Sequence, residues 1–220
     1  MSSFILKIIG IITMLIDHIG YVFYDHSILR VIGRIAFPIF AFQSVIGYEH
    51  TSNKKKHLLK LFLFGVISQI PFYLMNNAVK QFASLNIMFT ILLGLISISI
   101  FNKFSNRFDG LLAVFFICFL GIILRVDYGW FGVLLIFLFN YFKDNKIKMV
   151  LATCILFILH YAMKIVYLDT LYYLKLLFSS FLSLVPICLY NKKEGIKTKY
   201  LFYVFYPLHM LLLWLIFIII

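Results

Sequence analysis

The sequence is divided into about nine apolar segments by short stretches of charged and turn residues. Their approximate limits are residues 4–24, 28–48, 58–75, 84–101, 110–124, 129–142, 149–168, 170–190 and 200–219. A helix needs about 20 mostly apolar residues to cross a bilayer, and a crossing segment must satisfy its own backbone hydrogen bonds. The pattern therefore predicts an all-α, polytopic transmembrane helix bundle with about nine spans, and eight or ten are alternatives.

The composition excludes most other classes of protein. Only 13% of the residues are charged, 64% are hydrophobic and the mean hydropathy is +1.03, whereas a soluble domain has roughly a quarter of its residues charged. This excludes a soluble enzyme, a disordered chain and a secreted disulfide scaffold. The first apolar segment has no small-residue cleavage site, so we expect it to be retained as a helix. With short loops throughout, residues 1–220 are expected to form a single membrane domain.

The net charge of +12 is distributed unevenly between the loops. Thirteen of the 20 basic residues lie in alternate loops, namely Lys54, Lys55, Lys56, Lys60, Lys103, Arg107, Lys143, Lys146, Lys148, Lys192, Lys193, Lys197 and Lys199. The other loops hold Arg30, Lys80, Arg125 and Lys164. Basic loops face the cytoplasm, which predicts a cytoplasmic N-terminus. We attribute the positive charge to contact with the lipid bilayer rather than with nucleic acid.

Four ionisable residues lie at membrane depth, where a charge is costly and marks a candidate functional site. They are Lys7, Asp17, His18 and Arg34. Lys7 and His18 are eleven residues apart, close to three helical turns, and so share a face at roughly 16 Å separation. Asp17 and Arg34 lie at similar depth and are expected to pair. Either this pair only holds two helices together, or it also positions Arg34 for chemistry.

His18 is the expected proton carrier, because imidazole titrates near neutral pH. Asp17 cannot orient it, since adjacent residues on a helix diverge by about 100°. His209, in the last segment, is expected either to stabilise charge near the thioester of a bound donor or to be a packing residue. Gln69, Asn86, Asp127 and Trp130 lie near the outer level and form the expected acceptor site.

The other histidines and the cysteines carry no assigned function. His26, His50, His57 and His160 are expected in loops or at the membrane interface, and Tyr128 is expected to be an interfacial anchor. The three cysteines, Cys118, Cys154 and Cys188, lie within apolar segments and lack metal-ligand spacing, so no metal site is predicted.

Six segments resemble the TraX family, whose namesake acetylates the N-terminus of a conjugative pilin. They are IITMLIDHIG at 11–20, GRIAFPIFAF at 33–42, LFGVISQIPF at 63–72, LNIMFTILLG at 85–94, DYGWFGVLLI at 127–136 and YLFYVFYPLHM at 200–210. The first helix also resembles acyltransferase family 3, in which a basic residue precedes a histidine with ten residues between them. Lys7 and His18 have this spacing.

The resemblance implies an acyltransferase of the bacterial cytoplasmic membrane that takes acetyl from cytoplasmic acetyl-CoA. His18 would be the family's functional histidine and Arg34 the arginine of the second helix. The phosphates of acetyl-CoA would lie against Lys7 and the loop lysines Lys54, Lys55 and Lys56. The acceptor stays open between a pilin-like peptide, another peptide amine and an envelope glycan hydroxyl, and so does the oligomeric state.

Two other functions remain as alternatives. A small-molecule transporter would also place charges at depth, but it would usually show internal repeats with broken helices in matching halves, and none is seen. A non-catalytic assembly or immunity protein would use the polar pairs only to hold its helices together. Turnover of labelled acetyl-CoA separates the three functions.

Overall fold

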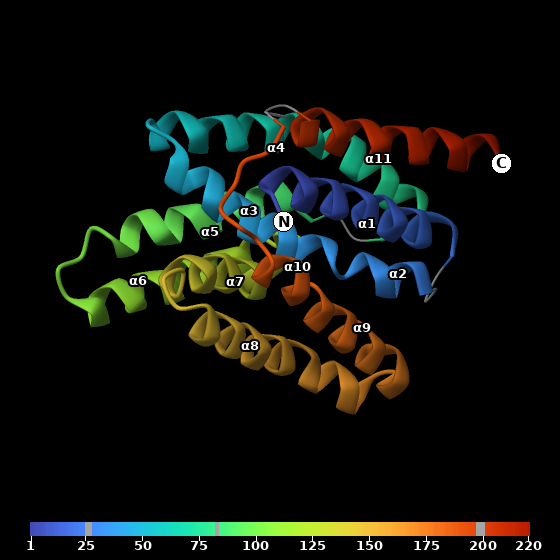
Figure 1. Ribbon diagram of the computed structural model, residues 1–220. Helices are drawn as coiled ribbons and strands as arrows, with labels where there is room; N and C mark the ends of the chain where they lie inside the picture. The colour runs from blue at the N-terminus through green and yellow to red at the C-terminus, as the bar shows by residue number, and fades with distance from the viewer. Residues whose placement is uncertain (25–27, 82–83, 197–200) are drawn as a thin grey trace.

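The computed structural model describes residues 1–24, 28–81, 84–196 and 201–220; His26, Lys197 and Lys199 lie outside them. This part of the chain forms eleven helices (Figure 1). They are α1 (Ser3–Phe23), α2 (Ile28–Gly33), α3 (Ala36–His50), α4 (Lys54–Ala78), α5 (Ile87–Phe101), α6 (Arg107–Ile123), α7 (Gly129–Tyr141), α8 (Lys146–Tyr167), α9 (Thr170–Leu182), α10 (Leu184–Cys188) and α11 (Leu201–Ile219).

Short breaks divide two of the predicted segments. A turn at residues 34–35 separates α2 from α3, and Ser183 separates α9 from α10. The eleven helices thus form nine helical stretches in the described residues, which match the nine predicted segments in order and approximate limits.

The number of helices that can cross a membrane is smaller than nine. Six stretches of the described chain are long and apolar enough: α1, α2 with α3, α4, α8, α9 with α10, and α11. The helices α5 and α7 are apolar but have only 15 and 13 residues. At 1.5 Å per residue, 13 residues extend about 20 Å, less than the roughly 30 Å hydrocarbon core. The prediction of nine spans is therefore supported for six, and the orientation in the membrane stays a prediction.

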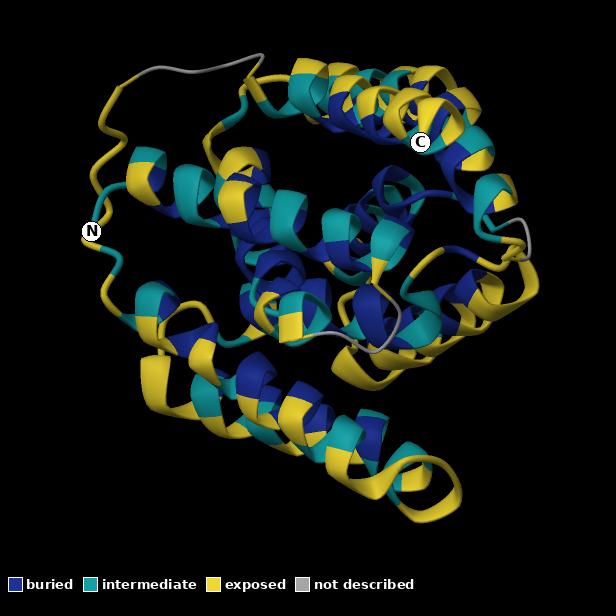
Figure 2. Cartoon of the chain, turned by 90° about the vertical axis from the view of Figure 1, so that its right-hand side faces the viewer, coloured by how far each residue is buried: buried dark blue, intermediate teal, exposed yellow. Residues whose placement is uncertain are grey.

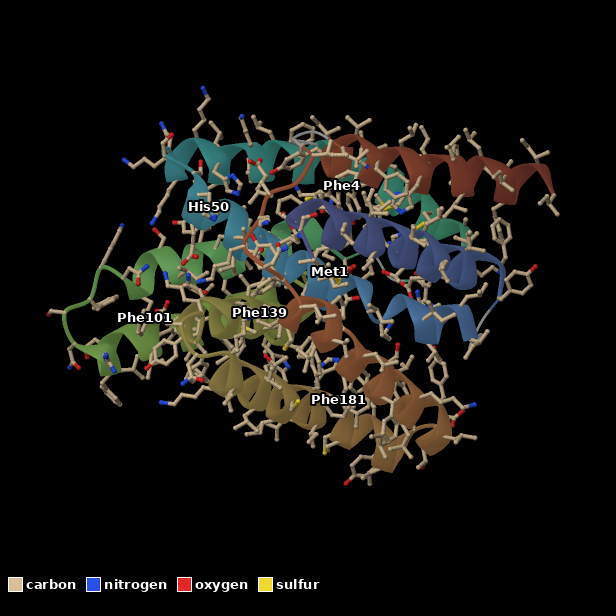
Figure 3. All side chains as sticks on the ribbon, in the orientation of Figure 1. Met1, Phe4, His50, Phe101, Phe139 and Phe181 are labelled. Carbon is tan, nitrogen blue, oxygen red and sulfur yellow. The ribbon has the colours of Figure 1, made fainter. Side chains whose placement is uncertain are left out.

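Asparagine residues begin three helices at one end of the bundle. The side chains of Asn53, Asn106 and Asn145 accept hydrogen bonds from backbone N–H groups in the first turns of α4, α6 and α8, which satisfies donors that a helix leaves unpaired. The loops before these helices lie at the left of Figure 1, where α3 and α5 finish at His50 and Phe101 (Figure 3). Several of the basic loops that were predicted to share one side of the membrane therefore lie at the same end.

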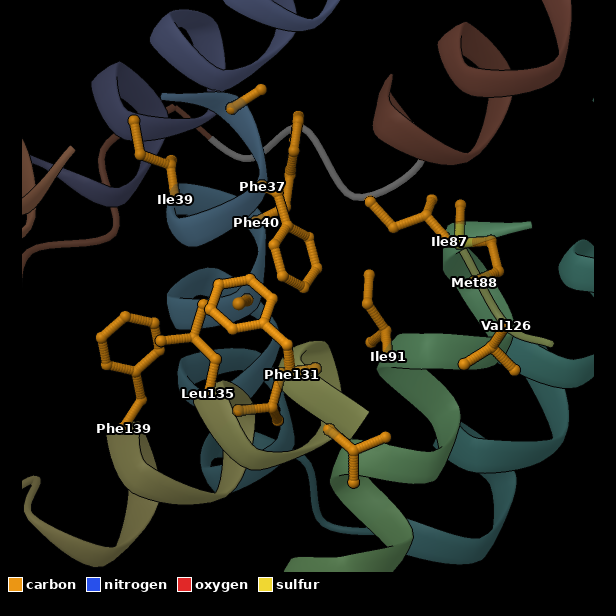
Figure 4. Packing of buried hydrophobic residues seen from close by; sticks show 14 of the residues in the cluster. Phe37, Ile39, Phe40, Ile87, Met88, Ile91, Val126, Phe131, Leu135 and Phe139 are labelled. Atoms are coloured by element: carbon orange, nitrogen blue, oxygen red, sulfur yellow. The ribbon is translucent and has the colours of Figure 1, made fainter. Parts of the chain in front are cut away.

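The packed core lies around α3 and α7, in the middle of the bundle. Phe37 on α3 and Phe131, Leu135 and Phe139 on α7 are buried, and Figure 4 shows them packed with Ile91 of α5. By contrast, Figure 2 shows exposed residues along the outer faces of α4, α8 and α11, and many of these residues are large and apolar. Such continuous apolar surface is typical of helices that face lipid rather than water.

Candidate functional site

A cavity of about 330 Å³ opens among α1, α2, α3, α4, α8 and α11, the first residue of α5 and the α6–α7 connection. Its polar lining consists of Asp17, His18, Tyr21, Arg30, Arg34, Asn76, Gln81, Ser84, Asp127, Tyr128, His160, Lys164 and Tyr206. Its apolar lining includes Met14, Phe37, Phe40, Phe72, Met75 and Ile87. We call it the polar cavity. Ionisable side chains from five different segments of the sequence thus surround one small space.

Asp17 of α1 is the centre of an ion cluster in this cavity. Its Oδ1 accepts a hydrogen bond from Nη2 of Arg34 at 2.7 Å, as the sequence predicted. Its Oδ2 accepts a second from Nη1 of Arg30, also at 2.7 Å. One largely buried carboxylate is therefore shared by two arginines, and one positive charge is left in excess.

Gly33 allows this cluster to form. A Cβ atom at residue 33 would lie 2.2 Å from the side chain of Asp17, closer than any real contact allows. The absence of a side chain lets α2 approach α1 at the level of Asp17, so that Arg30 and Arg34, one turn apart on α2 and the turn after it, both reach the carboxylate.

His18 faces away from this carboxylate and pairs with His209 of α11. His18 Nδ1 lies 2.6 Å from His209 Nε2, and the two rings are almost parallel, with an angle of 4°. The other nitrogen of His209, Nδ1, lies 2.8 Å from the carbonyl oxygen of Phe205. The Phe205 ring also stacks on the His209 ring. His209 is buried, whereas His18 is half-buried and lines the cavity.

These contacts fix the tautomers of the two neutral rings. A carbonyl oxygen can only accept, so His209 carries its proton on Nδ1 and its Nε2 is an acceptor. His18 must then carry its proton on Nδ1 and donate it to His209. The lone pair of His18 is left on Nε2, where it is available to a general base. The hydrogen-bond partner of His18 in the described structure is therefore His209 and not Asp17.

Two further charged residues in the cavity have no ionic partner in the described structure. Asp127 comes from the α6–α7 connection, and its backbone N–H is held by the carbonyl of Leu85 at 2.8 Å. Lys164 of α8 lies 3.1 Å from Nε2 of His160, one turn earlier on the same helix. Asp127 was expected at the acceptor site, whereas His160 and Lys164 were expected at a loop or an interface.

The structure places three predicted acceptor residues outside the polar cavity. Gln69 and Asn86 bind each other at 2.9 Å, and the Asn86 amide also donates to the Gly65 carbonyl at 2.7 Å. Asn86 is fully buried and begins α5. Their polar groups are used to hold α4 against α5, so we correct their expected assignment to the acceptor site. Trp130 lies beside the His160 ring, one layer behind the cavity wall.

A second hollow, the basic pocket, lies at the other end of α3 and measures about 510 Å³. Its charged lining consists of Glu49, Lys54, Arg107, Lys143, Asp144 and Lys148, and its aromatic lining of Tyr48, Phe101, Tyr141 and Phe142. Of the four lysines expected to bind phosphates, Lys54 lines this pocket, with its ammonium 5.0 Å from the centre of the Tyr48 ring. Lys55 and Lys56 are exposed beside it, and the half-buried Lys7 lines neither hollow.

Sequence reasoning missed Arg30, His160, Lys164 and the cavity position of Tyr128. A local signal existed for the first three, because Arg30 precedes Arg34, and His160 precedes Lys164, by four residues and therefore shares its helix face. Tyr128 stacks on Phe37 with ring centres 3.7 Å apart, a contact between distant segments that has no local signal. Among the described residues, no group of three or more side chains is arranged to hold a metal ion.

Comparison with known proteins places this site in a family context. The family model of the TraX protein matches residues 2–217. The chain is 30% identical over 238 residues to the probable fimbrial assembly protein FimC, serogroup H1, of Dichelobacter nodosus, covering 96% of this chain and 94% of that protein. It is 37% identical over 105 residues to the uncharacterized protein RP591 of Rickettsia prowazekii (strain Madrid E), covering 47% of this chain and 39% of that protein.

No solved structure matches this chain. The family match extends over nearly the whole bundle and includes every helix that lines the polar cavity, so the cavity, its ion cluster and its histidine pair all lie within the matched region. By this match the chain belongs to the TraX family of membrane proteins.

Proposed function

We propose that this protein is an integral membrane acetyltransferase that moves acetyl from cytoplasmic acetyl-CoA to an acceptor amine or hydroxyl at the outer side of the membrane. The observation that carries the proposal is the paired His18, whose Nε2 lone pair is fixed at the wall of a cavity large enough for a small acceptor group. A base held in one tautomer is what proton abstraction from an acceptor requires.

The reaction would be a direct transfer. As the acceptor nitrogen or oxygen attacks the thioester carbonyl, His18 Nε2 removes its proton, and His209 stabilises the resulting imidazolium through the shared hydrogen bond. Collapse of the tetrahedral intermediate breaks the carbon–sulfur bond. The proton then passes from His18 to the departing thiolate, which leaves as the coenzyme A thiol. No acyl-enzyme is proposed, because within the described ranges no serine or cysteine is suitably paired with a base.

Arg34 is the proposed donor to the oxyanion of that intermediate. Its Nη2 is bound to Asp17 and its Nε to the carbonyl of Arg30. Its Nη1 has no partner among the described residues and is left to face the cavity. Asp17 would thus position Arg34, and the planar guanidinium would present a preset donor in a site with little water.

The basic pocket is the proposed site for the phosphates of the donor. Phe37 of the polar cavity and Tyr48 of the basic pocket are eleven residues apart on α3, about 16 Å along a helix. An extended pantetheine arm can bridge such a distance. Packed side chains of α3 and α7 lie between the two hollows, so their movement is part of this proposal. Lys54 would bind the phosphates by charge.

Asp127 is the proposed contact that attracts an amine acceptor in its ammonium form, and the nitrogen attacks only after the ammonium has released one proton to water. The name of the Dichelobacter nodosus relative, a probable fimbrial assembly protein, favours a pilin-like peptide over an envelope glycan hydroxyl. The same name also supports the second candidate function, a non-catalytic assembly protein in which the ion cluster only joins helices. For a small-molecule transporter we find no specific supporting observation.

The test is transfer by the purified protein. Protein in lipid nanodiscs is incubated with radiolabelled acetyl-CoA and an extract of envelope peptides and glycans, and the parent chain is compared with His18→Ala. We expect label on one acceptor with the parent chain only, and mass spectrometry then identifies that acceptor by a gain of one acetyl group. Binding of acetyl-CoA without transfer in the parent chain would favour the assembly protein instead.

A further inference from the structure

The polar cavity contains more cationic than anionic side chains. Arg30, Arg34 and Lys164 line it on the cationic side, and Asp17 and Asp127 on the anionic side. The Asp17 carboxylate is already shared by both arginines at 2.7 Å. Its negative charge is therefore already opposed by two cations, and in the described structure Lys164 makes no hydrogen bond to it.

The Lys164 ammonium has hydrogen-bond donors that no described acceptor uses. It has three hydrogens, of which one is accepted by His160 Nε2 at 3.1 Å. Its other described contacts are with the faces of aromatic rings, 5.6 Å from the centre of the Tyr161 ring and 6.0 Å from that of Tyr173. Two strong donors of a half-buried ammonium thus have no acceptor among the described residues.

Arg34 adds donors of the same kind. Its Nη1 is unpaired in the described structure, while Nη2 and Nε are bound. The side chain is only 16% exposed, so bulk water compensates it poorly. A largely buried cation is less well hydrated than one in water, so an anion that enters the cavity would be bound more strongly there than at the surface.

We infer that the acceptor carries an anionic group, a carboxylate or a phosphate, beside the amine or hydroxyl that is acetylated, and that Lys164 binds this group in the polar cavity together with one of the two Nη1 hydrogens of Arg34. The other Nη1 hydrogen remains for the oxyanion. The inference rests on the proposed function for the identity of the ligand as an acceptor. The binding of an anion rests only on the unpaired donors. A cavity of about 330 Å³ holds one residue-sized group, so the anion and the reacting atom belong to the same residue or to adjacent ones.

Anion binding can be measured without any catalysis. Trp130 lies beside His160, which contacts Lys164. In a Trp214→Phe background Trp130 is the remaining tryptophan and reports on this wall. We titrate inorganic phosphate against sodium chloride of equal ionic strength and expect a saturable change in fluorescence with phosphate only. Lys164→Gln should abolish the change, Lys164→Arg should retain it, and the exposed Lys175→Gln on α9 is the matched control.

Equal phosphate responses of the parent chain and Lys164→Gln would overturn the proposal, as would the lack of any saturable response in the parent chain. Either result would be independent of transfer. A response that requires Lys164 in a protein that never transfers acetyl would support the anion site and count against the proposed function.

A second measurement tests whether the anion bound by Lys164 is part of the acceptor. Glycylglycine and its C-terminal amide are compared as acceptor probes, because they have the same amine and differ in one negative charge. We expect the acid to have a KM about tenfold lower or better, and Lys164→Gln to remove this preference with little change in kcat. Equal KM values for both probes in the parent chain would contradict an anionic acceptor.

Discussion

The two hollows at opposite ends of α3 both contain ion pairs, and these pairs differ in their surroundings. In the polar cavity, the Asp17 side chain is 11% exposed and its two arginine partners 20% and 16%. In the basic pocket, Glu49 and Lys143 are paired, but their side chains are 33% and 47% exposed. If one partner is removed, water can hydrate the charge that remains in the Glu49–Lys143 pair, but it can do so far less in the Asp17 cluster. Burial, rather than the kind of pair, therefore decides what each pair contributes.

The two ends also differ in how their side chains are held. His18 is fixed by His209, and Arg34 by Asp17 and the Arg30 carbonyl. In the basic pocket, several lysines and an arginine lie near one another. There the hydrogen bond with Glu49 is the main reason that the pKa of Lys143 is raised. We expect single substitutions to be severe in the cavity and mild in the pocket.

His18→Ala gives the largest expected effect. It removes the proposed base, which accounts for about 10²- to 10⁴-fold of rate, while its half-buried position lets the bundle stay folded. Transfer of labelled acetyl and thermal unfolding in nanodiscs are measured together. A folded variant with the turnover of the parent chain would exclude His18 from the reaction.

Asp17→Asn should destabilise the protein more than either arginine substitution. It leaves two largely buried guanidinium groups without a counter-charge, and breaking a buried pair costs roughly 3–5 kcal/mol. Arg30→Gln and Arg34→Gln each leave Asp17 one partner, so smaller losses are expected, and the triple variant should be strongly non-additive. Thermal unfolding in detergent measures all four. If Asp17→Asn lowered stability no more than Arg30→Gln, the shared carboxylate would not be the centre of the cluster.

Two substitutions of His209 test whether this residue positions His18 or only packs against it. In His209→Gln the amide oxygen can accept from His18 Nδ1, so part of the activity should remain, whereas His209→Ala leaves His18 free to change tautomer and should lose about 10- to 100-fold in kcat. The pH profile of kcat should shift in His209→Ala and stay close to that of the parent chain in His209→Gln. The same loss in both variants, with an unmoved profile, would indicate a packing residue.

Lys54→Ala tests the basic pocket against its matched neighbour. Phosphate binding is similar in the ground and transition states, so we expect a several-fold higher KM for acetyl-CoA with kcat little changed. Lys55→Ala removes the same charge from an exposed residue outside the pocket and should change KM less. Identical KM values for the two variants would remove Lys54 from the donor site.

Lys143→Ala should have the smallest effect on stability. Exposed ion pairs contribute about 0.2–1 kcal/mol and are screened by salt. The comparison with Asp17→Asn is made by thermal unfolding at low and high salt, and any destabilisation by Lys143→Ala should shrink at high salt. A loss as large as that of Asp17→Asn would show that exposure does not separate the two ends.

The sequence determined the helices and one ion pair. Apolar length and charged boundaries gave nine helical stretches in order, because each helix satisfies its backbone hydrogen bonds locally. The Asp17–Arg34 pair followed from equal depth on consecutive helices. The two shortest predicted segments, at 110–124 and 129–142, correspond to α6 and α7, which are not among the six candidate spans, whereas nothing in the segment at 84–101 indicated that α5 would be too short as well.

Only the tertiary structure decided which distant residues share the cavity. His18 and His209 are 191 positions apart, Asp127 reaches the site because its loop binds Leu85, and Gln69 and Asn86 are used to bind one another. In lipid, the outer and inner faces of a helix are both apolar, so hydropathy does not reveal which face turns inward. The close packing of the helices determines which face of each one turns inward. At Gly33, for example, the lack of a side chain lets α2 pack close to Asp17. This packing brings the charged side chains together.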